Sequence, residues 1–520
     1  MTRNMLMRME ISKQSINNSN FFAAAEQKYN ELTGTLQDRH TLAMKFSDVE
    51  KLIESDGREL LRLLLQAHID SRGDGDIGDF VDGADGITRT HKRIGERQIK
   101  SIFGEIACER MGYGMRNIES LFPKDSHLNL PENSHSYELQ RRVALEVMKG
   151  SFGDATEAIA TNTGQFIFKQ QIEYITVGVT NDFDAFYQSN LSEKNIIEAK
   201  KTPLLVLTTD GKGIVMRKSD LRKATRDKAD AADNKLEKRL SPGEKKNAKR
   251  MATVASVYNI DPFIRTADDF KNELSSVKIV EEIKRPKPIA KRVWASIEKS
   301  QEAVISEIFD EALRRDPEKN KTWVVLVDGA PAQINLIKKE AKSRGIKITI
   351  ACDIIHVVEY LWKAAWAFFD TGDRKAEAWV NERFISILEG KSSSVAAGIR
   401  RSATNQKLKK SQREAVDTCC DYLLKKSPYL KYHEYLAQGF PIATGIIEGA
   451  CRYLIKDRMD ITGARWRMIG AEAVLKLRSL KASGDFTSYW KFHEEQEFNR
   501  IHKSKYKNPS VINKLHIKKV

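Results

Sequence analysis

Residues 204–213 read Leu-Leu-Val-Leu-Thr-Thr-Asp-Gly-Lys-Gly, an apolar run that leads directly into an acidic residue, Asp210. A continuous run of this kind is typical of a strand that is buried on both faces of an α/β sheet. A second run, Trp323-Val-Val-Leu-Val, leads in the same way into Asp328. Ligands of open α/β sheets bind beyond the carboxyl ends of the strands, so we expect both carboxylates at one functional edge.

A third acidic residue, Glu448, lies in residues 441–452, Pro-Ile-Ala-Thr-Gly-Ile-Ile-Glu-Gly-Ala-Cys-Arg, which predict the first turn of a helix. Its neighbours Ile446, Ile447 and Ala450 are apolar, and we therefore expect Glu448 to face a site rather than open water. Two carboxylates after strands and one on a later helix can hold two Mg²⁺ or Mn²⁺ ions. Such an ion pair carries out phosphodiester cleavage and strand transfer.

Simpler roles also fit these three residues. Asp-Gly is among the commonest turn dipeptides, and it occurs at both Asp210 and Asp328. Near the start of a helix, Glu448 would interact favourably with the helix dipole, and it could pair with Arg452 one turn later.

A further acidic residue, Asp353, begins the stretch Asp353-Ile-Ile-His356, which follows the next β-run. Asp353 is either the N-cap of a helix or a metal ligand that supplements or replaces one of the other acids. His356 is either a hydrogen-bonded core residue or a group that orients a carboxylate or phosphate. Other catalytic schemes lack their motifs, because the chain contains no GxSxG, no HExxH and no P-loop.

The composition favours an anionic polymer as the partner. Lys and Arg number 87 against 71 Asp and Glu, which gives a net charge of +16. A merely basic enzyme would share this balance. The 5 Cys form no CxxC pair, which argues against a disulfide framework and fits a reducing cytoplasm. No apolar run approaches the ~18 residues of a membrane span, and the first residues lack the apolar region of a signal peptide.

Strand and helix patterns alternate through residues 203–360. Between two of the β-runs lies an amphipathic helix with Ile334, Ile337 and Ala341 inward, ended by Gly345, so those two strands should be parallel. The four predicted strands are Leu204–Thr209, Met251–Tyr258, Trp323–Val327 and Ile346–Ile350.

No strand pattern appears from Val357 to Gln438, where helices near 375–389 and 411–425 indicate an all-helical insertion in the α/β core. Helical patterns continue from Ile446 to Leu480. The chain is accordingly divided into a region of mixed structure (1–125), a helical DNA-binding domain (126–195), the first part of the core (196–356), the helical insertion (357–440), the second part with the Glu-bearing helix (441–495) and a basic tail (496–520).

Residues 136–185 predict three short helices with a Gly-containing turn, Thr161-Asn-Thr-Gly164, before the last. This pattern resembles a helix-turn-helix, whose last helix enters the major groove of DNA. Lys169, Gln170 and Gln171 would then meet phosphates or base edges. A plain three-helix bundle fits the same pattern.

Several long motifs, in this order, resemble bacterial insertion-sequence transposases of the ISKra type. The resemblance extends from about residue 60 to residue 495. It rests on Asp210–Arg217, Leu240–Lys246, Lys249–Val254, Lys291–Ser296, Val327–Gly329, Asp353–Trp362, Pro441–Arg452 and Lys456–Trp466.

The resemblance implies a DDE transposase with an RNase-H-like catalytic core on a mixed sheet, interrupted by a helical insertion. Such an enzyme uses Mg²⁺ to cut at the ends of its mobile element and joins the freed 3′-OH to target DNA. Asp210, Asp328 and Glu448 match the three acids by position, while Asp353 also begins a family motif and leaves the second acid open. The amino-terminal regions of these enzymes bind terminal inverted repeats, which favours the helix-turn-helix interpretation.

The basic residues after Glu448 would grip backbone phosphates, or they are ordinary surface charges: Arg452, Lys456, Arg458 and Arg465. The implied partners are double-stranded DNA, at the element ends and at the target, and further copies of the chain, since synapsis of two ends needs a dimer or higher oligomer. The implied location is the nucleoid in a bacterial cytoplasm. Two alternatives are a non-catalytic DNA-binding regulator and an RNase-H-like nuclease without strand transfer.

Overall fold

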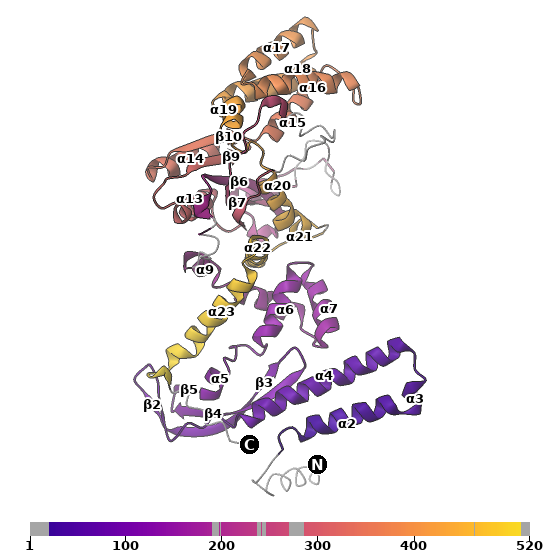
Figure 1. Cartoon of the computed structure of the whole chain (residues 1–520), viewed down its shortest axis with the longest axis vertical. Helices are drawn as coiled ribbons and strands as arrows, with labels where there is room; N and C mark the ends of the chain where they lie inside the picture. Colours follow the sequence, from indigo (N-terminus) through magenta and orange to yellow (C-terminus); the bar gives the residue numbers. More distant parts are fainter. Residues whose placement is uncertain are drawn as a thin grey trace. The chain divides into compact units, whose positions relative to one another are not determined.

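The computed structural model describes residues 20–189, 197, 199–233, 235, 236, 241, 246–269, 285–461 and 463–510. The chain forms two compact units, which we call unit 1 (residues 1–182 and 487–520) and unit 2 (residues 183–486). The elements of both are labelled in Figure 1. The six-segment division is finer than this and stays a prediction.

Unit 2 is built on a five-stranded mixed sheet with the order β10-β9-β6-β7-β8. β6, β7 and β8 are antiparallel neighbours, whereas β9 lies parallel to β6 and β10 parallel to β9. This mixed sheet with its helices is compatible with an RNase-H-like core. The strands are β6 (Leu204–Val215), β7 (Lys249–Ile260), β8 (Ile289–Ser296), β9 (Thr322–Val327) and β10 (Ile348–Cys352).

The four predicted strands are present, and the two joined by α14 (Pro331–Ser343) are parallel as expected. The turn interpretation of Asp210-Gly211 is wrong, because β6 continues to Val215 and Gly211 pairs with Thr253 of β7. β8 escaped prediction because Lys291 and Arg292 interrupt its apolar pattern.

Helices surround this sheet. α13 (Gln301–Arg315) packs on β7 and β6, and α22 (Met468–Ser483) packs on β8. Between β10 and the closing part of unit 2 lie α15 (Ile354–Ala365), α16 (Arg374–Leu388), α17 (Ser392–Asn405), α18 (Lys410–Lys426) and α19 (Tyr432–Ala437). The predicted helices near 375–389 and 411–425 correspond to α16 and α18. Buried residues of these helices belong to the same apolar cluster as the strands, so they share one core with the sheet.

The remaining elements of unit 2 are short. α9 (Phe183–Ser189) precedes the sheet, and η1 (Lys218–Asp220) and α11 (Lys223–Asp230) follow β6. η2 (Ser427–Tyr429) links α18 to α19. After α19 come α20 (Gly445–Ala450), the π-helical turn η3 (Cys451–Lys456) and α21 (Asp457–Met459).

A buried charge network ties α13 to β8. Glu311 is 1% exposed and accepts hydrogen bonds from Arg292, from Arg314 (2.8 Å) and from Arg315 (2.6 Å). Burial alone would raise the pKa of Glu311, but Arg292, Arg315 and Arg314 hold it well below its usual range. The carboxylate is therefore ionised and is the shared counter-ion of three guanidinium groups.

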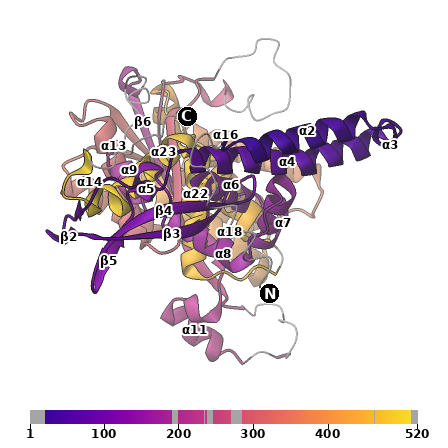
Figure 2. The ribbon, with the colours of Figure 1, turned by 90° about the horizontal axis from the view of Figure 1, so that it is seen from below.

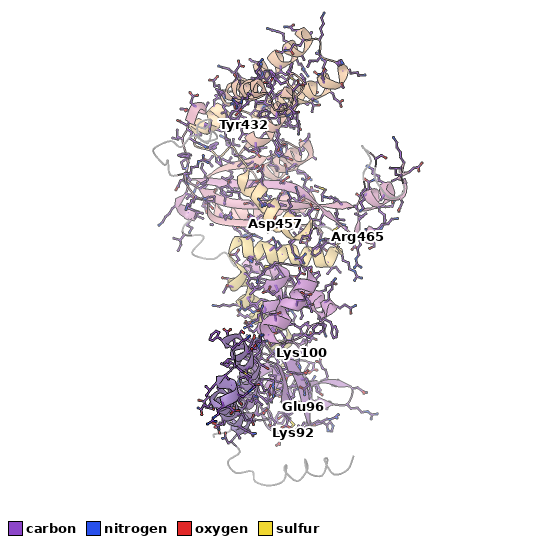
Figure 3. All side chains as sticks on the ribbon, turned by 90° about the vertical axis from the view of Figure 1, so that its right-hand side faces the viewer. Lys92, Glu96, Lys100, Tyr432, Asp457 and Arg465 are labelled. Carbon is purple, nitrogen blue, oxygen red and sulfur yellow. The ribbon has the colours of Figure 1, made fainter. Side chains whose placement is uncertain are left out.

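The described part of unit 1 begins with a helical hairpin of α2 (Ala23–Gln37) and α4 (Phe46–Ser71), joined through α3 (Arg39–Leu42), as Figure 2 shows from below. α4 also packs on β4 (Glu105–Met115), the middle strand of an antiparallel sheet with β3 (His91–Lys100) and β5 (Ile118–Leu121). Lys92, Glu96 and Lys100 follow one another along β3 (Figure 3). Smaller elements are β1 (Val81–Asp82), β2 (Thr88–Arg89) and α5 (Pro123–His127).

The three predicted helices of residues 136–185 are α6 (Tyr137–Val147), α7 (Phe152–Thr163) and α8 (Lys169–Gly178). Ser151 and Asp154 form a reciprocal capping box at the start of α7, and Gly164 ends it with a φ of 68°. Apolar residues at helical spacing, including Leu139, are buried between the three helices.

The last described segment of the chain completes unit 1. On α23 (Phe486–Ile501), Tyr489 donates a hydrogen bond of 2.7 Å to the carbonyl of Val179. After η4 (Lys503–Lys505), Tyr506 forms an antiparallel bridge with Gly83. Unit 1 is therefore assembled from two parts of the chain that are about 300 residues apart.

Candidate active site

Three aspartates lie at one level of the parallel part of the sheet: Asp210 within β6, and Asp328 and Asp353 directly after β9 and β10. The β6–β9 register, carried two residues past the pair Thr208–Leu326, sets Asp210 beside Asp328. The β9–β10 register, carried one residue past its last pair, sets Asp328 beside Asp353. Since neighbouring strands lie about 4.8 Å apart, residues at one level are close in space. Asp328 follows the end of β9 as predicted, whereas the prediction that Asp210 ends its strand is wrong, because β6 continues to Val215. The extended register nevertheless sets the two aspartates side by side.

Asp210 is held by contacts from segments that follow it at a distance in the sequence. Its Oδ2 accepts a hydrogen bond of 3.1 Å from the Sγ of Cys451, at the start of η3. Burial and the Asp210 carboxylate raise the pKa of the Cys451 thiol, so the thiol keeps its proton and acts as a donor. Gln333 of α14 is buried and donates to the carbonyl of Thr209 at 3.0 Å. Cys451 therefore holds the carboxylate itself, whereas Gln333 holds the backbone directly before Asp210.

Asp328 lies just after β9 and is held by the helical block. Its backbone carbonyl accepts a hydrogen bond of 3.1 Å from the Oη of Tyr422 on α18. The ring of Tyr422 stacks on that of Tyr360 on α15, with centroids 4.2 Å apart. Gly329 has a φ of 97°, a backbone conformation that a side chain would strain. The helices between β10 and α20 therefore reach the site and position Asp328.

Glu448 lies in the first turn of α20, as predicted, and its side chain is exposed. α20 packs against β6 and β7. Partial removal from water, and then the carboxylate of Asp353, raise the pKa of Glu448; Glu359 and Asp210 add to this, whereas His356 opposes it. Of the three aspartates, Asp353 and Asp210 thus act electrostatically on Glu448. Carboxylates that raise one another's pKa in this way are suited to a hard divalent cation, which binds through oxygen.

Asp353 is fully buried and its oxygens are already bonded. Oδ1 accepts from the backbone N–H groups of Ile355 (3.1 Å) and Thr444 (3.2 Å), and Oδ2 accepts from the hydroxyl of Thr444. Asp353 is the N-cap of α15 and ties that helix to the segment before α20. This geometry favours the capping role over the metal-ligand role. His356 is partly exposed, with its Nδ1 3.5 Å from Glu359.

A tighter cluster lies in unit 1. In the described ranges, one group of three or more His, Cys, Asp or Glu has all its ligand atoms within 4.8 Å of one another: Asp182, His493 and Glu497. The acids of the sheet edge are not grouped this closely. Asp182 and Glu497 both pair with Arg500, and His493 lies 2.7 Å from Asp182. Because both carboxylates already pair with Arg500 and Asp182 also contacts His493, the cluster is an ion network that holds α23.

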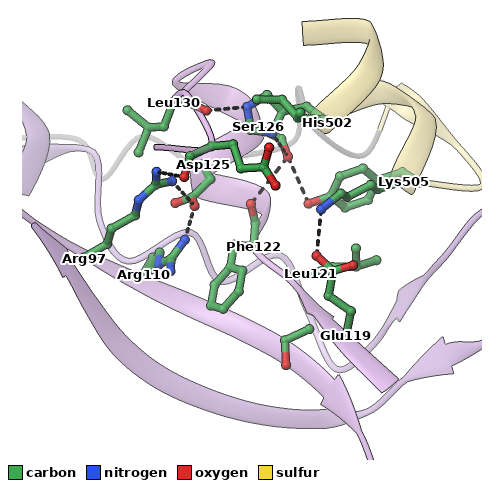
Figure 4. A pocket seen from close by; sticks show the side chains of 14 residues that line it. Arg97, Arg110, Glu119, Leu121, Phe122, Asp125, Ser126, Leu130, His502 and Lys505 are labelled. Atoms are coloured by element: carbon green, nitrogen blue, oxygen red, sulfur yellow. Dashed lines mark hydrogen bonds and ion pairs between the residues drawn. The ribbon is translucent and has the colours of Figure 1, made fainter. Parts of the chain in front are cut away.

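A cavity of about 250 Å³ in unit 1 is lined by charges that pair with one another (Figure 4). Arg97 and Arg110 both donate to Asp125, and Lys505 pairs with Glu119 at 2.8 Å. The charged side chains of this cavity are thus already paired with one another.

The DNA-binding candidates differ in their exposure. Lys169, Gln170 and Gln171 are exposed at the start of α8, and so are Arg452, Lys456 and Arg465 (Figure 3 labels Arg465). Arg458 is 3% exposed, with its guanidinium 4.8 Å from the ring centre of Trp466. Arg458 is therefore buried and does not present its charge to a phosphate, unlike the other three basic residues after Glu448.

No protein-family model and no curated protein matches the chain. Among solved structures, the strand transfer complex of the Drosophila P element transposase is similar over 69% of this chain and 87% of that chain, with 10% identity and a TM-score of 0.17. That likeness is too weak to establish a common fold. No described helix is both long and apolar enough to cross a membrane.

Proposed function

We propose that the protein is a metal-dependent DDE transposase of the ISKra type. It binds the terminal inverted repeats of an insertion sequence, cuts at the element ends and joins the freed 3′-OH to target DNA. The observation that carries this proposal is the register of β6 and β9, which, when extended, sets Asp210 beside Asp328. In addition, the Asp210 carboxylate contributes to the raised pKa of Glu448. The net charge of +16 and the motifs that resemble ISKra-type enzymes support DNA as the substrate.

In this proposal Asp210, Asp328 and Glu448 hold two Mg²⁺ or Mn²⁺ ions. When bound, such ions supply the Lewis acidity that activates the attacking oxygen and stabilises the leaving one. The chain itself contributes position. Cys451 orients the carboxylate of Asp210, Tyr422 holds the backbone of Asp328, and the Asp353–Thr444 contact places the helix that carries Glu448.

The test is a labelled duplex that carries the end of the protein's own element, incubated with wild type or Glu448→Gln in Mg²⁺ or EDTA. Nicking at the element's 3′ end that is lost in EDTA and in the variant supports the proposal, as does joining of that end to a target plasmid. Glu377→Gln, at an exposed position on α16, is the matched control. Cleavage without joining would indicate a nuclease, and specific binding without cleavage a regulator.

Glu448→Gln is also expected to raise the melting temperature of the metal-free protein. The raised pKa of Glu448 means that its ionised form destabilises the fold. Below the normal range of a glutamate pKa, the variant and wild type should have the same melting temperature. The difference should grow as the pH rises through the raised pKa, because wild type then loses stability as Glu448 ionises. Calorimetry in EDTA at pH 4 and pH 8 measures this, and a variant that melts below wild type at pH 8 would contradict it. Mg²⁺ should stabilise wild type more than the variant.

The start of α8 is proposed to read the element end. Lys169→Ala should remove one phosphate contact. The slope of log K against log [salt] should therefore become less steep by about 1. Gln170→Ala should reduce discrimination between the element end and unrelated DNA by about 1–3 kcal/mol. Fluorescence anisotropy over a salt series measures both, with Lys51→Ala on α4 as the control. Unchanged specificity and slope would remove α8 from the interface.

A further inference from the structure

One face of α4 exposes a row of large apolar side chains. Phe46 is 79% exposed, Ile53 44%, Leu61 43% and Leu64 39%. Their spacing of seven, eight and three residues keeps them on one side of a helix. Other faces of α4 are occupied, since it packs on α2 and β4. Among the described residues, these four side chains keep much of their surface in water.

A glycine lies in the middle of this row. Gly57 falls four residues after Ile53 and four before Leu61, and a Cβ built on it would meet no atom within 4 Å. Glycine weakens the middle of a helix relative to alanine. Nothing in the described part of the chain accounts for the missing side chain. A gap at this point allows the backbone of a second helix to approach closely.

We propose that this row, the α4 stripe (Phe46, Ile53, Gly57, Leu61 and Leu64), is the surface through which two copies of the chain associate. The equal spacing of Ile53 and Leu61 about Gly57 fits a two-fold crossing at the glycine, with Ile53 of each copy against Leu61 of the other. This association does not depend on the reaction proposed above.

Charge and area both favour a second copy over DNA. By helical spacing, the polar residues on this face are Glu50, His68 and Ser71, so it offers a phosphate backbone no lysine or arginine. The exposed parts of the four apolar side chains amount to roughly 400 Å² per copy, the size of a functional patch. Together with the surrounding surface, two such patches reach the ~1,000 Å² that a specific interface needs.

The test measures the mass of the full-length protein without DNA or metal, by light scattering and sedimentation over a concentration series. Wild type is expected to approach twice its chain mass of 59.1 kDa as concentration rises. Ile53→Glu with Leu64→Glu should raise the dissociation constant at least about 30-fold. Ile94→Glu, at an exposed apolar position on β3, is the control and should leave it unchanged. A wild type that stays monomeric, or a dimer that survives the double variant, would overturn the proposal.

A pair of glycines separates association from folding. Gly34 of α2 is as open as Gly57, so alanine at either position should stabilise its helix and raise the melting temperature. Only Gly57→Ala should weaken association, by about tenfold, because only that methyl group would stand between two helices. If Gly34→Ala and Gly57→Ala had the same dissociation constant, the two helices would not cross at Gly57. Mixing Ile53→Cys with Leu61→Cys protein should give more disulfide-linked dimer than either alone, and the reverse would contradict the two-fold arrangement.

Discussion

Asp328→Asn is expected to lower Mg²⁺-dependent cleavage of element-end DNA by about 10³-fold or more, with little change in melting temperature. A metal ion contributes several kcal/mol of transition-state stabilisation, and each 1.4 kcal/mol is a factor of ten in rate. The asparagine keeps the shape of the side chain but not its charge. Asp328 is partly exposed, and its carboxylate accepts a hydrogen bond of 3.2 Å from the backbone N–H of Ala330. The amide oxygen of asparagine can accept the same bond. Single-turnover cleavage with a labelled duplex measures the effect.

The comparison that decides the second acid is Asp353→Asn. Its buried oxygens accept from Ile355 and Thr444, and asparagine is also a good N-cap, so we expect cleavage within about tenfold of wild type. Asp373→Asn, a substitution at the corresponding N-cap of α16, is the matched control. If Asp328→Asn cleaves normally and Asp353→Asn does not, the second acid is Asp353.

Glu311→Gln is expected to lower the free energy of unfolding of unit 2 by about 3–5 kcal/mol, because removing one partner of a buried ion network leaves unpaired charge in the core. Here three guanidinium groups, those of Arg292, Arg314 and Arg315, share one carboxylate. Urea denaturation followed by fluorescence measures the change, with attention to separate transitions of the two units.

Glu377→Gln, on an exposed helix face, should stay within about 0.5 kcal/mol of wild type. If Glu311→Gln lowers the free energy of unfolding by less than 1 kcal/mol, then water or a local rearrangement stabilises the charges of the three arginines in the absence of the carboxylate. The depressed pKa of Glu311 implies that its stabilisation persists above the normal glutamate range and is lost only as the pH falls towards the depressed value.

Patterns local in the sequence predicted much of the fold. The apolar runs before Asp210 and Asp328 predicted β6 and β9, and the helical spacing of Ile334, Ile337 and Ala341 predicted α14 and the parallel pair around it. Burial on both faces leaves a strand with a nearly unbroken apolar signal. The sequence of β8 lacks an unbroken apolar run because it contains Arg292, which is buried through its hydrogen bond to Glu311. The spacing of apolar residues in the sequence does not predict such a contact.

The sequence also pointed to the acids of the candidate site but not to the groups that hold them. Cys451 and Tyr422 contact Asp210 and Asp328 across long stretches of chain. Nothing in their neighbours sets them apart from ordinary core residues. Thr444 is similar, since its bond to Asp353 appears only when α15 and α20 are brought together. Such contacts join residues that are far apart in the sequence, so the pattern of neighbouring residues does not predict them.

The return of α23 to unit 1 has a consequence for the timing of biosynthesis. Residues 20–182 leave the ribosome long before Tyr489 and His493, whose partners are Val179 and Asp182. At 5–20 residues per second, the delay for about 300 intervening residues is roughly 15–60 s. During that interval unit 1 lacks its final helix while unit 2 is still being made. A ribosome that stalls or stops short of residue 487 would therefore release a chain with nearly all of its mass but an unfinished amino-terminal unit.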